Sequence, residues 1–391
     1  MSAVARPETP EAGVRRVVLA AGGTGGHMFP AQALARALIG LGREVVLITD
    51  RRGGGFGPEL PQVETHRINA GGIAGGSPLR KLASLWLLGI GYLQARALLK
   101  QLGAEAVVGF GGYPSVPTVL AGARRGLRVV LHEQNAIMGR ANRLLARHAD
   151  RIATSFGQVG ALPDELHDRV VLTGNPVRAA VGALGRRPYA VPGEADPLRL
   201  LVIGGSQGAV VFNGVIPAAV ARLPETLRRR LRVSQQVRGR DLSEVADEYR
   251  ESGVEAELAP FFEDLPERLA EAHLVICRAG ASTVAELAAA GRPAILVPYP
   301  FATDDHQTAN GGAFAEAGGG WLMPQSELNP ERLAERLAEL LDQPSLLGRA
   351  AGCARSQARL EAAERLAALV CGEREPNGGA KDGEGREEAA A

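Results

Sequence analysis

The sequence predicts an α/β protein of two domains, each built on a parallel sheet. Apolar runs that end in glycine or polar residues alternate with helical patterns, which is typical of βαβ units. This series occurs twice along the chain, and its first turns, AAGGTGG at 20–26 and VIGGSQG at 202–208, are similar. The length of 391 residues also favours two domains, at ~100–200 residues per domain.

The first series begins with RRVVLAAGG at 15–23, an apolar run that predicts a buried parallel strand entering a turn. A helical pattern follows at 27–42 and ends at Gly42, and the next strand is expected at 43–50. The same strand pattern recurs at 104–112, 127–135 and 169–175.

In the second series, strands are expected at 198–208, 231–237, 273–280 and 292–300, and helical patterns fill 330–371. The segment 176–197 contains four prolines and is the expected linker. The last 20 residues contain no Val, Ile, Leu, Met or aromatic residue, which indicates disorder. We therefore expect a flexible leader at 1–13, an N-terminal domain at 14–175 onto which a helix at 348–371 packs back, a C-terminal domain at 176–347 and a disordered tail at 372–391.

Composition excludes several classes of protein. The net charge of +1 argues against a dedicated nucleic-acid binder, and three cysteines without a C-x-x-C exclude a disulfide scaffold and a zinc ribbon. The first residues lack the apolar segment of a secretory signal. The uncharged run at 82–95 has 14 residues, whereas a bilayer span needs ~20. We expect a cytosolic or membrane-peripheral protein.

Glycine-rich clusters follow the predicted strands, where open α/β sheets bind ligands. The sequence GGTGGH at 22–27 follows the first strand and opens a helix, which favours an anion. The dinucleotide fingerprint fails, because Met28 stands where a third glycine is required. The helix dipole is expected to lower the pKa of His27, which suits a general base. The alternative is a tight turn whose histidine only caps or packs.

The second series repeats this turn at 204–208, where backbone N–H groups and the Ser206 hydroxyl are expected to hold a diphosphate. Arg178 is expected to bring its guanidinium to the same phosphates, and the alternative for it is a solvated surface charge. At 278–286, Ser282 and Thr283 are residue types that cap helices. Glu286 either completes a capping box with Thr283 or binds the two hydroxyls of a ribose.

Three further polar or glycine-rich clusters follow strands, at 109–115, 132–135 and 300–310. Polar side chains at these positions indicate contact with a ligand. No D-x-D sequence occurs, so no Mg²⁺ or Mn²⁺ site on a sugar diphosphate is predicted.

The span 65–132 is strongly basic, with eight Lys or Arg residues and a single acid, Glu105, for a net charge of +7. An apolar run containing Leu85 and Trp86 lies inside it, flanked by Arg80, Lys81 and Arg96. This combination predicts docking on an anionic membrane surface. The alternative is an ordinary buried helix surrounded by solvated arginines.

Seven ordered motifs between residues 15 and 345 resemble the MurG family of glycosyltransferases: GGTGGH, GFGGYPSVP, HEQNAIMGRAN, TGNPVR, GGSQGA, RAGASTVAEL and DDHQTANG. The resemblance implies a GT-B fold, in which two Rossmann-like domains face each other across a cleft. It implies an inverting transfer of N-acetylglucosamine (GlcNAc) from UDP-GlcNAc to the 4-hydroxyl of N-acetylmuramic acid (MurNAc) in lipid I, undecaprenyl-pyrophosphoryl-MurNAc-pentapeptide. The products, lipid II and UDP, belong to peptidoglycan precursor synthesis on the cytoplasmic face of the cell membrane, with no cofactor.

The resemblance also assigns site residues. The general base is expected among His27, Tyr113, His132 and Glu133, with His27 favoured. Phe262 stands where relatives often have an aliphatic residue whose backbone binds uracil. The residues expected to contact the donor are Thr24, Gly25, Gly26, Asn135, Arg178, Ser206, Phe262, Ala281, Ser282, Thr283, Val284, Ala285, Glu286 and Gln307.

Other functions stay open at this point. A UDP-sugar 2-epimerase or a glycosyltransferase with another lipid acceptor would share the fold, although an epimerase would not need the basic, apolar span. Asp50, at the end of the second predicted strand, would suit an NAD(P)-dependent oxidoreductase, against which the failed fingerprint stands. A non-catalytic membrane scaffold would leave His27, Asn135 and Glu286 without a role.

Overall fold

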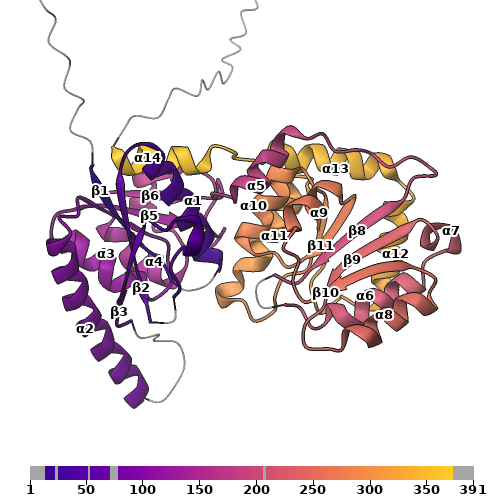
Figure 1. Ribbon diagram of the computed structural model, residues 1–391, viewed down its shortest axis with the longest axis horizontal. Helices are drawn as coiled ribbons and strands as arrows, with labels where there is room; N and C mark the ends of the chain where they lie inside the picture. Colours follow the sequence, from indigo (N-terminus) through magenta and orange to yellow (C-terminus); the bar gives the residue numbers. More distant parts are fainter. Residues whose placement is uncertain (1–13, 23–24, 52, 71–77, 206–207, 373–391) are drawn as a thin grey trace, which may run out of the picture.

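The computed structural model describes residues 14–22, 25–51, 53–70, 78–205 and 208–372, which form two parallel sheets with helices on their faces (Figure 1). The predicted leader lies outside the described residues, as does all but the first residue of the predicted tail. None of the helices in the described part of the chain has the length and hydropathy that a membrane span requires.

The first sheet has the strand order β3-β2-β1-β4-β5-β6-β7, and all its pairs are parallel. Its strands are β1 (Arg16–Ala20), β2 (Glu44–Asp50), β3 (Glu64–Ile68), β4 (Ala106–Gly109), β5 (Arg128–Glu133), β6 (Arg151–Thr154) and β7 (Val170–Leu172). The helices of this half are α1 (Gly25–Gly40), α2 (Pro78–Gln101), α3 (Ser115–Arg124) and α4 (Arg140–Leu145).

The second sheet has the order β10-β9-β8-β11-β12-β13 and is also parallel throughout. Its strands are β8 (Leu198–Ile203), β9 (Leu231–Gln236), β10 (Glu255–Ala259), β11 (Leu274–Cys277), β12 (Ala294–Leu296) and β13 (Gly320–Leu322). The remaining helices are α5 (Ala179–Gly182), α6 (Phe212–Ala221), α7 (Glu225–Arg228), α8 (Leu242–Glu251), α9 (Leu265–Glu271), α10 (Ala281–Ala290), α11 (His306–Glu316), α12 (Pro330–Leu341), α13 (Pro344–Ser356) and α14 (Ala362–Cys371).

Strand β1 shows why the central strands read as continuous apolar runs. Val17 and Leu19 pack in the cluster formed with α1 and α14, whereas Val18 and Ala20 pack in the cluster formed with α2 and α3. All four side chains are fully buried, because helices cover both faces of the sheet.

The structure adds strands that the sequence does not predict, namely β3, β6, β10 and β13. Strands β3 (ETHRI) and β10 (EAELA) are edge strands with partly exposed, mixed polar sequences, so they lack the apolar run of the central strands. Helix α1 begins at Gly25, two residues before the predicted start, which places His27 inside its first turn.

The chain crosses back to the first sheet near its C-terminal end. Helix α13 packs against α10 of the second half, whereas α14 packs against α1 and β5 of the first (Figure 1). A guanidinium N–H of Arg128 donates to the Leu369 carbonyl oxygen at 2.9 Å, which fastens α14 to the sheet.

In both sheets the strand order reverses beside the first strand, between β1 and β4 and between β8 and β11. The loops that leave these strands diverge to opposite faces, and the space between them is where such sheets bind ligands. The first-half loops carry the GGTGGH and GFGGYPS sequences, and the second-half loops carry GGSQG and RAGAS.

Candidate active site

The loops at the carboxyl ends of the two sheets meet, and Asn310 of α11 joins them. Its side-chain oxygen accepts the backbone N–H of Ala136 at 2.8 Å, and its amide nitrogen donates to the Asn135 side-chain oxygen at 3.1 Å. The same nitrogen donates to the Ala279 carbonyl oxygen at 3.1 Å. Helix α1 also contacts α10. The polar loops of both halves therefore line one interdomain site.

His27 lies in the first turn of α1, against the loop that follows β4. Its ring atoms lie 3.4–3.5 Å from the positions that Cβ atoms would occupy on Gly111 and Gly112, which have φ of 82° and 72°. These glycines give the loop a backbone conformation that other residues rarely adopt, and they leave room for the imidazole.

The electrostatics of His27 suit a neutral imidazole. Its Nδ1 atom is buried and makes no hydrogen bond within the described residues. Burial lowers the pKa of His27 below 6.5, because a buried site disfavours the charged ring. A half-buried neutral imidazole at a helix N-terminus can accept a proton near neutral pH.

His132 is fully buried at the end of β5, and both its ring nitrogens are engaged. The Gln134 amide lies 3.0 Å from Nδ1, and the Gly174 carbonyl oxygen lies 3.1 Å from Nε2, a pattern that places the ring proton on Nε2. Burial lowers the pKa of His132 to about 4. This histidine is neutral and has no free nitrogen for a substrate.

Glu133 is buried, and its carboxylate holds the loop that follows β5. One oxygen accepts the Asn135 backbone N–H at 2.9 Å and its amide at 3.3 Å; the other accepts the Gly139 N–H at 2.9 Å and the Asn142 amide at 2.8 Å. Burial raises the pKa of Glu133, and these hydrogen bonds oppose the shift. The carboxylate therefore sets the position of Asn135. Tyr113, the fourth base candidate, is half-buried beside the glycines that contact His27.

Arg178 and Glu286 bind each other. The guanidinium donates to the two carboxylate oxygens at 2.7 and 3.0 Å, and it lies 5.5 Å from the centre of the Phe29 ring in α1. The prediction placed Arg178 on phosphates and Glu286 on a ribose. The structure pairs these two side chains with each other beside α1, and their contacts with the donor stay a prediction.

Helix α10 begins differently from the prediction. Gly280 is the N-cap, with φ −65° and ψ 143°, so Ser282 and Thr283 lie inside the first turn and neither caps the helix. The capping-box interpretation of Glu286 is therefore wrong. The Ser282 hydroxyl is buried and makes no hydrogen bond among the described residues. Together with the first-turn backbone N–H groups of 281–283, it offers donors to an anion, whereas the Val284 N–H already donates to the Gly280 carbonyl oxygen.

The second glycine turn is sterically restricted. A Cβ on Gly204 would lie 2.4 Å from the Ala209 nitrogen, and Gly205 and Gly208 both have φ of 77°. Ser206 lies outside the described residues, and so does Thr24 of the first turn, whereas Gly25 and Gly26 form the start of α1. Close backbone packing with left-handed glycines is the geometry of a turn that a phosphate approaches.

Two further predicted donor residues lie in the second half. Phe262 is 3% exposed, and the Arg268 guanidinium lies 4.1 Å from its ring centre, so any ligand contact there falls to the backbone of this loop. The Gln307 side-chain oxygen accepts the Tyr299 backbone N–H at 2.9 Å, and this hydrogen bond orients its amide group. The predicted donor residues Ala281, Val284 and Ala285 lie in the first half of helix α10.

The sequence did not single out Asn310 or Asp304 as site residues. The sequence does show a high density of polar residues at 300–310, after β12. This density predicts a site in the loop, but it does not identify the side chain that contacts the other half. Among the described residues, no three His, Cys, Asp or Glu side chains are grouped as metal ligands would be.

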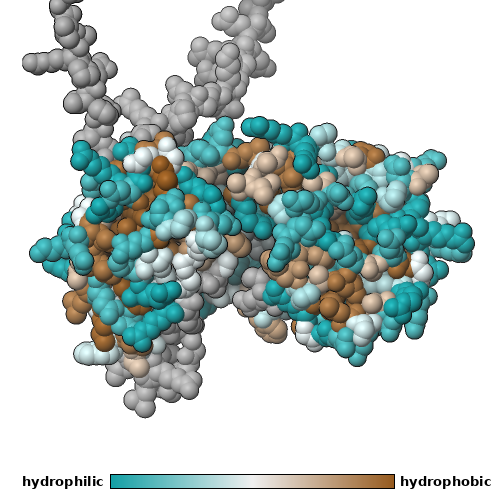
Figure 2. Space-filling model, viewed as in Figure 1, coloured by the Kyte–Doolittle hydropathy of each residue, from teal (hydrophilic) through white to brown (hydrophobic). Residues whose placement is uncertain are grey.

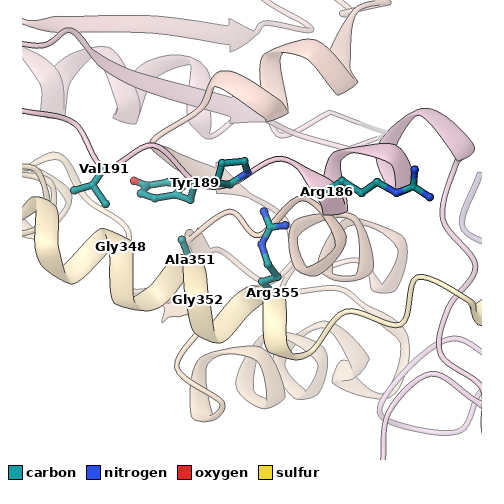
Figure 3. Close-up of a pocket in the computed structure, with 8 residues that line it drawn as sticks. Arg186, Tyr189, Val191, Gly348, Ala351, Gly352 and Arg355 are labelled. Carbon is teal, nitrogen blue, oxygen red and sulfur yellow. The ribbon is translucent and has the colours of Figure 1, made fainter. Parts of the chain in front are cut away.

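A separate groove of about 420 Å³ lies between the linker and α13 (Figure 3). Tyr189 and Arg355 line it, and Arg355 donates to the Gly185, Arg187 and Ala290 carbonyl oxygens. None of the predicted site residues borders this groove, and its Arg355 fastens α13 to the linker.

The chain matches models of both halves of one enzyme family. Residues 17–154 match the glycosyltransferase family 28 N-terminal domain, and residues 199–366 match its C-terminal domain. The fold and the site thus define a GT-B glycosyltransferase of family 28.

Curated relatives narrow this further. A protein of Paramagnetospirillum magneticum named UDP-N-acetylglucosamine--N-acetylmuramyl-(pentapeptide) pyrophosphoryl-undecaprenol N-acetylglucosamine transferase is 55% identical over 356 residues, covering 91% of this chain and 96% of that one. A Rhodospirillum centenum protein of the same name is 57% identical, covering 91% and 94%. The crystal structure of Acinetobacter baumannii MurG is 32% identical, with a TM-score of 0.74 over 91% of this chain and 99% of that one. The chain belongs to the MurG family.

The comparisons also show why the fold alone does not choose the reaction. A solved UDP-N-acetylglucosamine 2-epimerase has a TM-score of 0.62 over 91% of this chain and 95% of its own, at 14% identity. That likeness shows a shared fold and nothing more.

Proposed function

We propose that this protein transfers GlcNAc from UDP-GlcNAc to the MurNAc 4-hydroxyl of lipid I, releasing lipid II and UDP. The similarity to the named transferases, 55–57% over nine-tenths of the chain, is the observation that carries this proposal. The site geometry supports it, because one half presents a neutral imidazole and the other presents glycine turns and a helix N-terminus for a diphosphate.

In the proposed mechanism, His27 accepts the proton of the MurNAc hydroxyl as its oxygen attacks the anomeric carbon of GlcNAc. The bond from that carbon to the diphosphate oxygen breaks, and configuration inverts. The N–H groups at the start of α10, the Ser206 turn and Arg178 stabilise the negative charge that develops on UDP. Asn135, positioned by Glu133, and Gln307, positioned by the Tyr299 N–H, hold the sugar.

The test is acceptor-dependent release of UDP. Purified protein is incubated with UDP-GlcNAc alone and with a short-chain lipid I analogue added, and nucleotide and sugar products are separated. UDP should accumulate only with the acceptor. Formation of UDP-N-acetylmannosamine without acceptor would indicate a 2-epimerase, and UDP release that another lipid sugar supports better would indicate a different acceptor.

The proposal places the enzyme peripherally on the cytoplasmic face of the membrane, docked through α2. Trp86 is 73% exposed, Leu93 is 65% exposed and Leu85 is 55% exposed, and brown apolar surface appears over the α2 region in Figure 2. The alternative of an ordinary buried helix does not fit these exposures. Arg96 is exposed on the same helix, whereas the side chains of Arg80 and Lys81 lie outside the described residues. Apolar side chains next to basic ones favour an anionic bilayer.

We expect the Trp86→Glu variant to bind vesicles that contain anionic phospholipid at least about tenfold more weakly than the wild type, because it removes apolar area and adds a negative charge. Vesicle sedimentation measures this, and UDP binding should be unchanged. Leu41→Glu is the matched control, since Leu41 is an exposed leucine at the C-terminal end of α1 in the same half. Equal vesicle binding by wild type and Trp86→Glu would contradict docking through α2.

A further inference from the structure

The loop between β12 and α11 has an unusual backbone at two consecutive residues. Asp304 and Asp305 have φ of 53° and 51°, the left-handed region. This region is unfavourable for residues other than glycine, although aspartate and asparagine tolerate it better than most. Such a backbone conformation persists where surrounding contacts stabilise it. The contacts of the Asp304 side chain therefore show which interactions offset its cost.

Asp304 reaches across to the other half of the molecule. Its carboxylate accepts the Arg140 guanidinium at 2.7 Å and also pairs with Arg143, both residues lying on α4 of the first half. The paired arginines lower the pKa of Asp304, chiefly through the hydrogen bond from Arg140. The Arg140 and Arg143 side chains are 54% and 37% exposed, so these are ion pairs at the surface, which water screens.

This ion-pair cluster stands beside the loops that carry predicted donor residues. On α4, the Asn142 amide and the preceding Gly139 N–H are both held by Glu133, which also holds Asn135. On α11, Gln307 follows Asp304 by three residues, and Asn310 binds Ala136 and Asn135. Asp304 therefore joins the two loops at their outer end and Asn310 joins them at their inner end.

We propose that Asp304 is a positioning residue for glycosyl transfer: by pairing with Arg140 and Arg143 it fastens the start of α11 to α4 and fixes Gln307 relative to Asn135. The catalytic consequence rests on the proposed function, but the fastening itself does not. The ion-pair cluster of Asp304 and the amide bridge of Asn310 are each small enough to break and reform as the halves separate for exchange of substrates.

One amide reports this contact directly. The Ala136 N–H donates to Asn310 in the other half, whereas the Gly139 N–H, three residues away, donates to Glu133 within its own half. In Asp304→Asn, the left-handed backbone is retained because asparagine adopts it readily. We expect hydrogen exchange at Ala136 to accelerate by about fivefold in this variant, with Gly139 unchanged.

Asp247→Asn is the matched control, because Asp247 forms an exposed ion pair with Arg250 inside α8. It should leave exchange at Ala136 unchanged. The double variant Arg140→Gln/Arg143→Gln should match Asp304→Asn, and combining all three changes should add nothing further, since all remove one interaction. Unchanged exchange at Ala136 in Asp304→Asn, or equal acceleration at Gly139, would overturn the inference.

Kinetics supply the second readout. If Asp304 positions the donor residues, Asp304→Asn should raise the KM for UDP-GlcNAc by about fivefold, with a smaller change in kcat. An unchanged KM beside accelerated exchange would overturn the positioning role. Exchange is measured without substrates, so absence of any transfer activity in the wild type would count against the proposed function and not against the fastening.

Discussion

The His27→Ala variant is expected to lose about 10²–10⁴-fold in kcat while its KM for UDP-GlcNAc stays close to that of the wild type. The reason is that His27 belongs to the first half and packs against Gly111 and Gly112, whereas the glycine turn at 204–208 and α10, which are proposed to hold the donor, belong to the second half. Removing the base should therefore affect proton transfer more than donor binding. Steady-state kinetics with a lipid I analogue measure both constants.

The pH profile provides an independent check on the same residue. A general base works in its neutral form, and burial holds the pKa of His27 below 6.5. The rate constant kcat/KM should therefore be flat above about pH 6.5 and fall as the pH decreases below it, because protonation then removes the base. If the fall in kcat/KM had its midpoint well above pH 7, the result would contradict the assignment of His27 as the base.

Two controls separate the base from other histidines. His167→Ala removes an exposed histidine of the first half and should leave kcat unchanged. His132, with a pKa of about 4, affects stability: the unfolded chain binds its proton near pH 6.5 and the folded chain does not, so stability falls as the pH falls from 6.5 towards 4. Circular dichroism at each pH measures the folded fraction, so that a loss of activity caused by unfolding is distinguished from the loss of the base.

The second large effect is expected at Glu133. Glu133→Ala leaves four buried or half-buried donors without their acceptor, which should lower the free energy of unfolding by about 3 kcal/mol. The loop that carries Asn135 then loses its fixed position, so kcat should fall as well. Urea unfolding followed by circular dichroism, together with kinetics, measures both effects.

Glu105→Ala is the matched control for Glu133, because the Glu105 carboxylate is exposed and accepts only the Arg15 backbone N–H among the described residues. Its unfolding should resemble that of the wild type. A Glu133→Ala protein with unchanged stability and a kcat lower by ~10³-fold would instead identify Glu133 as a proton acceptor.

The central strands could be predicted because burial on both faces requires apolar runs, as in β1 and β8. The edge strands β3 and β10 could not, since their exposed positions allow charged residues. The strand order of each sheet also has no local signal, although it decides which loops become neighbours.

For the site, the sequence predicted which loops carry the polar residues, but it did not predict which side chains pair with one another. Arg178 pairs with Glu286, and Asp304 with Arg140, across more than 100 positions of the sequence. The second pair also joins the two halves, so it depends on how they approach each other. The capping interpretation of Thr283 was wrong because Gly280 adopts the N-cap conformation, three residues before Thr283. Residue type alone does not decide between neighbouring caps.

The measurement that tests the central claim most directly is transfer of label from radioactive UDP-GlcNAc to a short-chain lipid I analogue, with EDTA present throughout. The proposed function predicts label in the lipid product at the same rate with and without EDTA, because Arg178 and the N-terminal end of α10 stabilise the departing diphosphate. Bound UDP-GlcNAc with no label in the lipid, in the presence and absence of EDTA, would contradict the proposed reaction.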